Sequence, residues 1–424
     1  MKVLLVSANT EQINIPPLPL GLNCVAAAAG GAGHEIKVID LMAQENNSAV
    51  LRREIGNFRP DVIGVSVRNI DDQNIEAPQF LLDRVKEIAN DIRKASDAPL
   101  VLGGAGYSIF PESALEYLEA DMGIQGEGEK AFPLLIEKIS AGADLSGTPG
   151  LFLRGRGLQG PREFQDDLDA FPLPDPALSS VPEAGRRDIY MPFQTRRGCP
   201  FDCSYCSTPV IEGCALRMRS PGPVIDSISR YCGAGFGRFY FVDNIFNVPS
   251  SYAGEICSGI IARKLKISWR CIYYPGEADV KLVSLMASAG CSEVSLGFES
   301  GSGNILHRMN KKFSSAQVRR ASDILREHGI RRMGFLMLGG PGETEKTAEE
   351  SLAFADSLGL DSLKITIGIR IYPGTSLARC AVEDGLISPD DNLLFPKFYV
   401  VRGMYEWLQE TVQAWKKDRP CCTD

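Results

Sequence analysis

Three cysteines in the middle of the chain have a spacing that suits iron–sulfur chemistry. They are Cys199, Cys203 and Cys206, in the run Arg197-Gly-Cys-Pro-Phe-Asp-Cys-Ser-Tyr-Cys-Ser207. A [4Fe–4S] cluster normally takes four cysteine ligands, so a compact loop with three leaves one iron free to bind an exchangeable group. The spacing therefore favours a reactive cluster over a structural metal site.

Two other uses of these cysteines are open. A tetrahedral zinc site can combine three cysteines with a histidine. The histidines are His34, His307 and His328, and all three are distant from the loop in sequence. Unliganded buried thiols are the second alternative. The ligand chemistry favours the cluster.

The cysteine run resembles the cluster-binding loop of radical S-adenosylmethionine (radical SAM) enzymes, including the aromatic residue, Tyr205, before the third cysteine. The resemblance extends over roughly residues 190 to 390. It implies that the three cysteines hold a [4Fe–4S] cluster whose open iron binds the amino and carboxylate groups of S-adenosylmethionine. It also implies reductive cleavage of a carbon–sulfur bond that releases a 5′-deoxyadenosyl radical, while the protein orients the cofactors.

Two polar segments match positions where this family binds S-adenosylmethionine. Asp243 and Asn244, in Phe241-Val-Asp-Asn-Ile-Phe-Asn247, are predicted to lie near the methionine amino group, since a carboxylate suits an ammonium partner. Glu299, in Gly297-Phe-Glu-Ser-Gly-Ser302, is predicted to accept hydrogen bonds from the ribose or the amino group. An Asx turn and a cap of the loop are the structural alternatives for these two segments.

Two later segments also match the family pattern. Gly339 and Gly340 begin a Gly-Gly-Pro-Gly-Glu-Thr loop whose glycines would let backbone amides approach the bound nucleoside. Arg370 and Tyr372 lie in a segment that the resemblance places against adenine. The order and spacing of all five segments make the resemblance specific.

Short apolar runs alternate with helical patterns from residue 1 to residue 143, which predicts a doubly wound α/β domain with a parallel sheet. The expected strands are Val3–Val6, Ile36–Ile39, Val62–Val67, Leu100–Leu102 and Met122–Ile124. This rhythm resembles the flavodoxin-like (Rossmann-type) cobalamin-binding domain of many radical SAM proteins. Ligands of such sheets bind outside the carboxyl ends of the strands. Cobalamin is therefore expected at the loop of residues 14–21 and at Ser66, Gly103, Gly104 and Gly126.

The rest of the chain divides into three parts. Residues 144–190 are rich in Gly, Pro and Asp and are predicted to form a linker. Residues 191–394 are predicted to form a partial (β/α)6 radical SAM barrel, with the cysteines just after its first strand, because catalytic groups of barrels gather at the carboxyl ends of strands. Residues 395–424 are a C-terminal extension with an amphipathic segment, Met404–Trp415.

Composition limits the partners. The chain has 424 residues, a net charge of −8 and no long basic run, which argues against a nucleic-acid surface. It opens on a predicted strand and not on a signal peptide, and no apolar stretch is long enough to span a bilayer, so a cytoplasmic location is expected. The expected partners are a small-molecule substrate and an external one-electron reductant such as flavodoxin or ferredoxin.

The cobalamin prediction carries an alternative. No Asp-x-His-x-x-Gly motif is present to place a histidine on cobalt. The amino-terminal domain therefore either binds cobalamin without a protein ligand below the metal or docks the substrate without cobalamin, since a fold alone does not establish a function.

The predicted reaction is methylation of an unactivated centre of a small molecule or natural-product intermediate. One alternative is a cobalamin-independent transfer of the 3-amino-3-carboxypropyl group of S-adenosylmethionine to a soft acceptor held by the adjacent thiols of Cys421 and Cys422. A second alternative is a non-catalytic iron–sulfur or cobalamin sensor.

Overall fold

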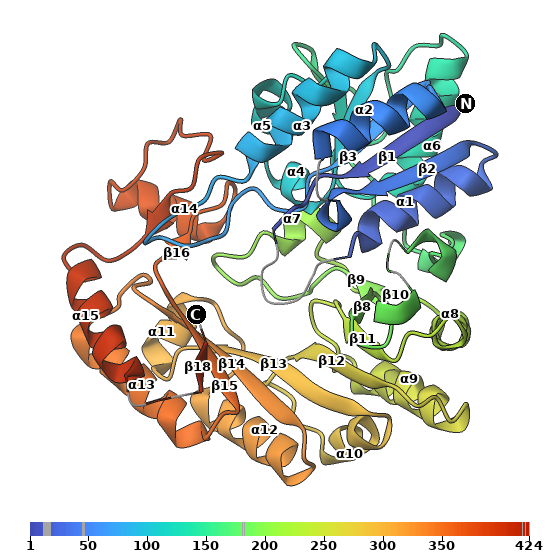
Figure 1. Cartoon of the computed structure of the whole chain (residues 1–424). Helices are drawn as coiled ribbons and strands as arrows, with labels where there is room; N and C mark the ends of the chain where they lie inside the picture. Colours follow the sequence, from blue (N-terminus) through green and yellow to red (C-terminus); the bar gives the residue numbers. More distant parts are fainter. Residues whose placement is uncertain are drawn as a thin grey trace. The chain divides into compact units, whose positions relative to one another are not determined.

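The computed structural model describes residues 1–11, 18–44, 47–179, 181, 183–417, 419 and 421–423. They form two compact units (Figure 1). Unit 1 comprises Met1–Asp72, Pro78–Arg186 and Val210–Gly213, and unit 2 comprises Gln73–Ala77, Arg187–Pro209 and Cys214–Asp424.

A parallel sheet forms the centre of unit 1. Its strands lie in the order β2-β1-β3-β4-β5-β6-β7. The parallel strands are β1 (Lys2–Ser7), β2 (Glu35–Asp40), β3 (Val62–Ser66), β4 (Leu100–Gly103) and β5 (Met122–Ile124). The direction of strand order reverses between β1 and β3, so the sheet has the topological switch point at which doubly wound folds bind ligands.

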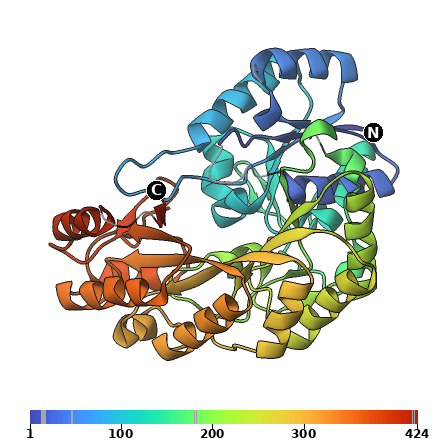
Figure 2. The same cartoon turned by 60° about the horizontal axis from the view of Figure 1, so that its bottom comes forward.

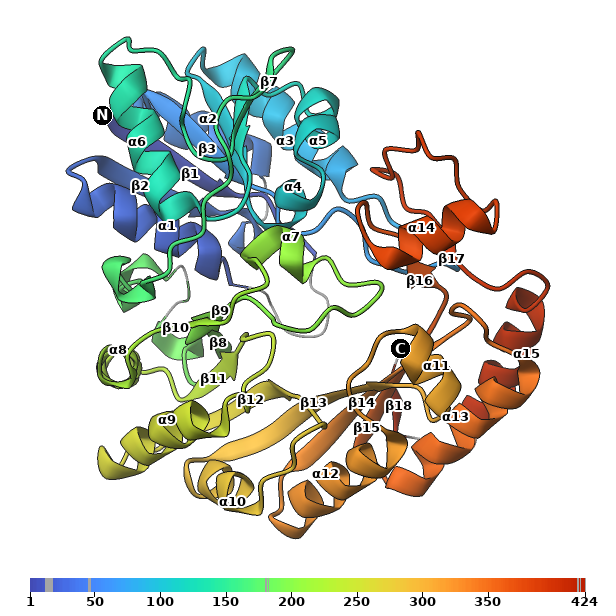
Figure 3. The ribbon, with the colours of Figure 1, turned by 180° about the vertical axis from the view of Figure 1, so that it is seen from behind.

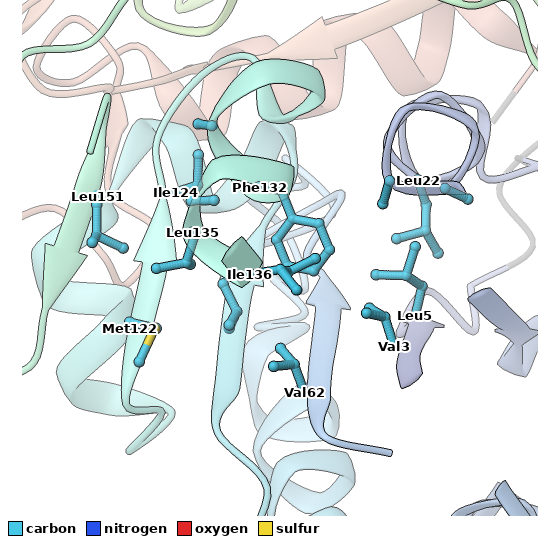
Figure 4. Close-up of a cluster of buried hydrophobic side chains, with 14 residues drawn as sticks. Val3, Leu5, Leu22, Val62, Met122, Ile124, Phe132, Leu135, Ile136 and Leu151 are labelled. Carbon is cyan, nitrogen blue, oxygen red and sulfur yellow. The ribbon is translucent and has the colours of Figure 1, made fainter. Parts of the chain in front are cut away.

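Helices follow each parallel strand of unit 1. They are α1 (Leu20–Gly31), α2 (Asn47–Phe58), α3 (Leu82–Ala95), α4 (Ala105–Ile109), α5 (Pro111–Tyr117) and α6 (Gly128–Ser140). Figure 4 shows the core that one sheet face forms with α1 and α6, in which Val3, Leu5 and Val62 of the strands meet Leu22 and Phe132 of the helices. Burial of both faces explains why these strands are continuous apolar runs and do not alternate.

Part of the predicted linker belongs to unit 1, which corrects the expected boundary. β6 (Leu151–Leu153) pairs antiparallel with β5, and β7 (Gly157–Leu158) pairs antiparallel with β6. These strands have only three and two residues, which is too few to be recognised within a Gly- and Pro-rich segment. Leu151 is fully buried in the core of unit 1, which ties this segment to the domain before it.

A second, mainly parallel sheet forms unit 2. Its strands lie in the order β18-β15-β14-β13-β12-β11-β8. They are β8 (Tyr190–Phe193), β11 (Arg238–Phe241), β12 (Ser268–Tyr273), β13 (Cys291–Glu299), β14 (Arg331–Leu338), β15 (Ser362–Ile367) and β18 (Cys422–Thr423). Two small ribbons accompany it: β9 (Arg196–Arg197) with β10 (Arg217–Met218), and β16 (Ile369–Arg370) with β17 (Phe398–Tyr399).

Helices of unit 2 cover one side of this curved sheet (Figures 2 and 3). They are α8 (Pro221–Gly233), α9 (Ser250–Ala262), α10 (Val280–Ser288), α12 (Ser315–Glu327), α13 (Glu345–Leu358) and α15 (Tyr405–Lys416). α11 (Gly303–Arg308) follows β13, and α14 (Ser376–Glu383) lies beside the β16–β17 ribbon. Phe298 of β13 packs edge-on against Phe354 of α13, with ring centroids 5.8 Å apart. Residues of β12, β14 and β15 that face the other way are mostly half-buried, as expected for the open side of a partial barrel.

The carboxyl-terminal tail joins this sheet at one edge. Leu363 pairs with Cys422 in the first half of β15, and the Leu363 amide donates to the Cys421 carbonyl at 2.9 Å. The tail is held by Arg419, which pairs with Asp356 of α13. The two vicinal thiols therefore lie near the amino-terminal end of β15 and not near its carboxyl end.

Candidate functional site

The cysteine loop begins directly after β8 and is held by the β9–β10 ribbon, in which Arg197 pairs with Arg217. Inside the loop, the Ser204 amide donates to the Met309 carbonyl at 3.0 Å, and the Leu377 amide donates to the Ser204 carbonyl at 2.8 Å. Backbone bonds on two sides thus fix the segment between Cys203 and Cys206, which positions the thiols at the carboxyl end of the first strand.

Asp243 anchors the chain just before this loop. One carboxylate oxygen accepts from the Thr195 amide at 2.7 Å and the other from the Thr195 hydroxyl at 2.6 Å. The Arg196 guanidinium lies 3.6 Å away, and both charged side chains are 0% exposed. Burial raises the pKa of Asp243, while Arg196 and the hydrogen bonds from Thr195 oppose the rise.

This arrangement corrects the role predicted for Asp243. Its carboxylate is fully enclosed and already bonded, so it is not placed to receive the amino group of S-adenosylmethionine. Asn244 is different: it is half-buried, and its side-chain oxygen accepts from the Thr208 hydroxyl at 3.4 Å. The same hydroxyl is 3.3 Å from the sulfur of Cys206, so Asn244 is the member of the pair that adjoins the cysteine loop.

Glu299 ends β13 in an unusual conformation. Its φ of 59° lies in the left-handed region, and the pairing of β13 with β14 shifts register between Gly297 and Glu299. A Cβ atom on Gly297 would lie 2.8 Å from the Glu299 carboxylate. The bulge and the missing side chain together let the carboxylate fold back at the strand end, which is how bulges re-aim side chains near active sites.

Lys311 is a functional candidate that the sequence analysis missed. Its ammonium lies 3.1 Å from the Glu299 carboxylate, and the two side chains are 9% and 11% exposed. The ammonium also lies 5.1 Å from the centroid of the Tyr205 ring. Two residues predicted separately, Tyr205 and Glu299, are therefore brought together by a lysine between them.

The neighbours of Lys311 keep its ammonium charged beside the thiols of the loop. Burial alone would lower the pKa of Lys311, but Glu299, Tyr205 and Cys203 outweigh it and raise that pKa well above its usual value. Burial raises the pKa of Cys199 to about 11 and also raises that of Cys203, with Lys311 opposing both shifts. Metal binding must displace these protons, and a neighbouring cation helps to stabilise the resulting thiolates.

The residues at the loop fit an iron–sulfur cluster by their chemistry. Three thiols lie on one short loop beside a buried cation, and thiolate is the ligand that such clusters take. Among the described residues, no group of three or more His, Cys, Asp or Glu side chains, the loop cysteines included, has metal-binding geometry. Their spacing and surroundings therefore carry the assignment.

Protein packing accounts for the glycines after β14. Gly339 has a φ of 91°, and a Cβ there would lie 3.2 Å from Val400. A Cβ on Gly340 would lie 3.0 Å from Ile369. The Gly339 amide donates to Glu343 at 3.3 Å, and burial raises the pKa of that carboxyl. The glycines were expected to allow a nucleoside to approach the backbone. Side chains of the protein, Val400 and Ile369, make part of that approach instead.

Arg370 has a structural role, which differs from the prediction. It is 4% exposed, and its guanidinium donates to the carbonyls of Ile371 at 2.7 Å and Leu393 at 2.9 Å. It also lies over the ring of Tyr372, 5.2 Å from the centroid. Tyr372 is half-buried, so this ring, held from behind by Arg370, is the part of the segment that is able to meet a planar ligand.

The predicted cobalamin residues of unit 1 lie together at the carboxyl edge of its sheet. Ser66 and Gly103 end the neighbouring strands β3 and β4. Gly104 has a φ of 100°, and a Cβ there would lie 2.5 Å from the Val67 carbonyl. Gly126, with a φ of 90°, follows β5, and its amide donates to the Ser108 hydroxyl at 2.9 Å. A Cβ on Gly126 would lie 3.0 Å from Arg162, so packing within unit 1 requires a glycine at this position as well.

A small crevice lies at the switch point of the same edge. It is lined by the residues after β1 and β3 and by the start of α3: Ala8, Asn9, Thr10, Glu11, Ser66, Val67, Arg68, Asn69, Leu81, Arg84 and Val85. Residues 12–17, which include most of the predicted loop after β1, lie outside the described part of the chain. The crevice lies where doubly wound folds bind their ligands, which is the position expected for a corrinoid.

Family models agree with this division. Residues 8–136 match the B12 binding domain, and residues 194–355 match the radical SAM superfamily. Unit 1 and unit 2 therefore correspond to two known modules that occur here in one chain.

Individual relatives align over most of the chain. An uncharacterized methyltransferase of Pyrococcus horikoshii is 28% identical over 91% of this chain and 84% of its own length. The tryptophan 2-C-methyltransferase of Streptomyces laurentii is 24% identical over 88% of this chain and 74% of its own. The solved structure of the radical S-adenosylmethionine methyltransferase TsrM from Kitasatospora setae, with cobalamin and a [4Fe–4S] cluster bound, is 25% identical, with a TM-score of 0.81 over 90% of this chain and 75% of TsrM.

A cobalamin-binding-type doubly wound domain followed by a radical SAM barrel defines a class of enzymes that use a [4Fe–4S] cluster, S-adenosylmethionine and cobalamin. The chain belongs to this family, the radical SAM enzymes with a cobalamin-binding domain. Radical SAM methylation of a small-molecule substrate is the activity that these comparisons support, and the sensor alternative is set aside. None of the helices in the described residues is long and apolar enough to cross a membrane.

Proposed function

We propose that Cys199, Cys203 and Cys206 ligate the [4Fe–4S] cluster and that the remaining iron binds S-adenosylmethionine. One observation carries the proposal. The ion pair of Lys311 with Glu299, at the carboxyl end of β13, lies against the ring of Tyr205, which is a residue of the cysteine loop. A buried cation and anion beside the thiols provide complementary partners for the carboxylate and amino groups of an amino acid.

Four side chains orient S-adenosylmethionine in this proposal. Lys311 holds the carboxylate, while Glu299 accepts from the amino group or the ribose. Asn244 contacts the amino group in place of Asp243, because Asn244 adjoins Cys206 through Thr208. Tyr372 packs against the adenine. When bound, the cluster supplies the electron that splits a carbon–sulfur bond, and these residues keep the reacting groups aligned and shielded from water.

The carboxyl edge of unit 1 binds cobalamin in this proposal. Ser66, Gly103, Gly104 and Gly126 would line the site, and a corrinoid held there would supply the methyl-transfer chemistry. His34 precedes β2 and so lies at the opposite, amino-terminal edge. Unit 1 thus supplies no histidine to the metal from its described residues, and the loops must hold the corrinoid by packing and hydrogen bonds.

The cobalamin module is assigned to residues 1–143 together with β6 and β7, and the radical SAM module to residues 191–394. The acceptor is a small molecule with an unactivated carbon, by analogy with the Streptomyces laurentii relative, which is named for methylation of carbon 2 of tryptophan. A cytoplasmic enzyme of this kind takes its electrons from a flavodoxin or a ferredoxin, and the net charge of −8 argues against a nucleic-acid partner.

The test is mass spectrometry of the products that anaerobically reconstituted, reduced protein forms from S-adenosylmethionine, with and without methylcobalamin. We expect 5′-deoxyadenosine, together with S-adenosylhomocysteine when the corrinoid is present. Methylthioadenosine formed without corrinoid would instead support transfer of the 3-amino-3-carboxypropyl group. The position of Cys421 and Cys422 near the amino-terminal end of β15 weighs against that alternative.

A further inference from the structure

Three exposed basic side chains lie beside the cysteine loop of unit 2. They are Arg308 at the end of α11, Lys312, and Arg379 on α14, and together they form what is called here the basic patch. The chain as a whole carries a net charge of −8. A local concentration of positive charge next to the expected redox centre is therefore contrary to the overall charge of the molecule.

The patch adjoins the loop through direct backbone contacts. Arg308 and Lys312 flank Met309, whose carbonyl accepts from the Ser204 amide, and the Asn310 side chain donates to the Asp202 carbonyl. Arg379 lies two residues after Leu377, whose amide donates to the Ser204 carbonyl. The two basic segments thus contact the same short stretch between the first and the last cysteine from two sides.

The three cations of the patch form no ion pair. Among the described residues, no carboxylate oxygen lies within 4.0 Å of Arg308, Lys312 or Arg379. Lys312 donates to the Asn310 side chain at 2.5 Å, and Arg379 donates to the Ser376 hydroxyl at 2.8 Å, so neutral groups are their partners. Some exposed cations elsewhere on unit 2 are paired, as Arg263 is with Asp226. Exposed carboxylates on the same two segments are Asp202 in the loop and Glu383 on α14.

We infer that the basic patch is the docking surface for a small acidic electron-carrier protein of the flavodoxin type. This inference rests on the proposed function, which needs one electron for each cleavage of S-adenosylmethionine. One electron leaves the carrier's flavin and enters the cluster; the flavin is oxidised, the cluster is reduced, and no covalent bond forms. Complementary charge at the contact steers an acidic partner and sets its orientation, which affects the association rate more than the final affinity.

Charge reversal tests the surface. The variant carries Arg308→Glu, Lys312→Glu and Arg379→Glu. The matched control carries Arg230→Glu, Lys281→Glu and Arg320→Glu, three side chains of unit 2 that are also exposed and that form no ion pair within 4.0 Å among the described residues. Each protein is assayed for 5′-deoxyadenosine formation with reduced flavodoxin and, separately, with reduced methyl viologen, a small cationic electron donor. The flavodoxin assays are run at low and at high salt.

We expect the flavodoxin-dependent rate of the patch variant to fall at least about tenfold at low salt and to become independent of salt concentration. Its viologen-dependent rate should stay unchanged. The control triple should keep both rates. Equal losses with both donors, equal losses in the control, or no loss in the patch variant would overturn the docking surface. Absence of cleavage by the unmodified protein with either donor would instead overturn the proposed function.

Discussion

Lys311 links the residues that the sequence pattern identified one by one. It is buried between Glu299 and Tyr205 and reaches toward Cys203. Removing only one member of such a buried pair leaves an uncompensated charge, which is more damaging than removing both. Substitutions in the Lys311–Glu299 pair therefore allow the effect on the free energy of unfolding to be distinguished from the effect on S-adenosylmethionine binding.

We predict that Lys311→Met lowers the free energy of unfolding by about 3–5 kcal/mol, because the Glu299 carboxylate remains buried without its partner. Denaturant titration measures this loss. Adding Glu299→Gln should recover most of the stability but not the binding of S-adenosylmethionine, measured by calorimetry. Lys346→Met, at a side chain that is 84% exposed, is the control and should change neither property.

Cys203→Ala is expected to remove both the cluster and the cleavage of S-adenosylmethionine, since two thiolates cannot replace three. Iron and sulfide analysis, together with the visible absorbance of the cluster, measures cluster content. Product analysis measures the cleavage of S-adenosylmethionine. Cys214→Ala changes an exposed cysteine outside the loop and should retain both. Cleavage by the Cys203 variant would contradict the ligand assignment.

At this scale the sequence predicted residue types better than residue roles. Cys199, Cys203, Cys206 and Glu299 lie at the expected strand ends, because a conspicuous spacing carries them. Lys311 could not be found, since its ion pair depends on a bulge that re-aims Glu299. Asp243 and Arg370 were given ligand roles, but buried hydrogen bonds to distant backbone groups use their polar atoms, and no local pattern signals such partners.

Among the elements, the turn from β8 into the cysteine loop depends on a partner from the next strand. The carboxylate of Asp243, directly after β11, holds the Thr195 and Arg196 amides. The cysteine loop is thus positioned by the residue that follows β11. A substitution of Asp243 should therefore lower cluster binding, although Asp243 is not a cluster ligand.

Asp243→Ala is expected to destabilise the protein by about 3–5 kcal/mol because it leaves the Arg196 guanidinium buried without its carboxylate. Urea denaturation measures the change, and cluster content after anaerobic reconstitution should fall with it. Asp226→Ala breaks an exposed pair with Arg263, in which the side chains are 58% and 53% exposed, and should cost less than about 1 kcal/mol. Similar losses in the two variants would contradict the anchoring role.

Gly104→Ala is expected to weaken cobalamin binding at least about tenfold, the equivalent of 1.4 kcal/mol. A methyl group there meets the Val67 carbonyl at 2.5 Å in a backbone with φ of 100°, so the loops after β3 and β4 must separate. Absorbance titration with hydroxocobalamin measures the affinity. Gly31→Ala, at a helical glycine with open space around it, should bind normally.

The strands of both sheets were predictable because buried apolar runs mark them. Val3–Val6 became β1 (Lys2–Ser7), and Met122–Ile124 became β5 with the same bounds. The helix Met404–Trp415 appears as α15, shifted by one residue. β6, β7 and β18 were missed because strands of two or three residues have too few side chains to show a period, and only pairing with a neighbouring strand creates them.

At the scale of the whole molecule, variants of the carboxyl-terminal tail distinguish methylation from transfer of the 3-amino-3-carboxypropyl group. Cys421→Ser combined with Cys422→Ser should leave the S-adenosylmethionine products unchanged, because the tail pairs with the first half of β15. Product analysis by mass spectrometry, as described above, measures this. Loss of turnover in this double variant, with the cluster intact, would revive the alternative in which the vicinal thiols hold an acceptor.

Two short segments are exchanged between the units: Gln73–Ala77 is grouped with unit 2, although β3 and α3 on either side belong to unit 1, and Val210–Gly213 is grouped with unit 1 within the chain of unit 2. No single cut in the peptide chain therefore separates the two units cleanly. Recombination at one junction between genes of related enzymes would leave each product with a foreign insert in its partner module. New specificities in this lineage are thus expected to arise by substitution within an inherited pair of modules rather than by shuffling them.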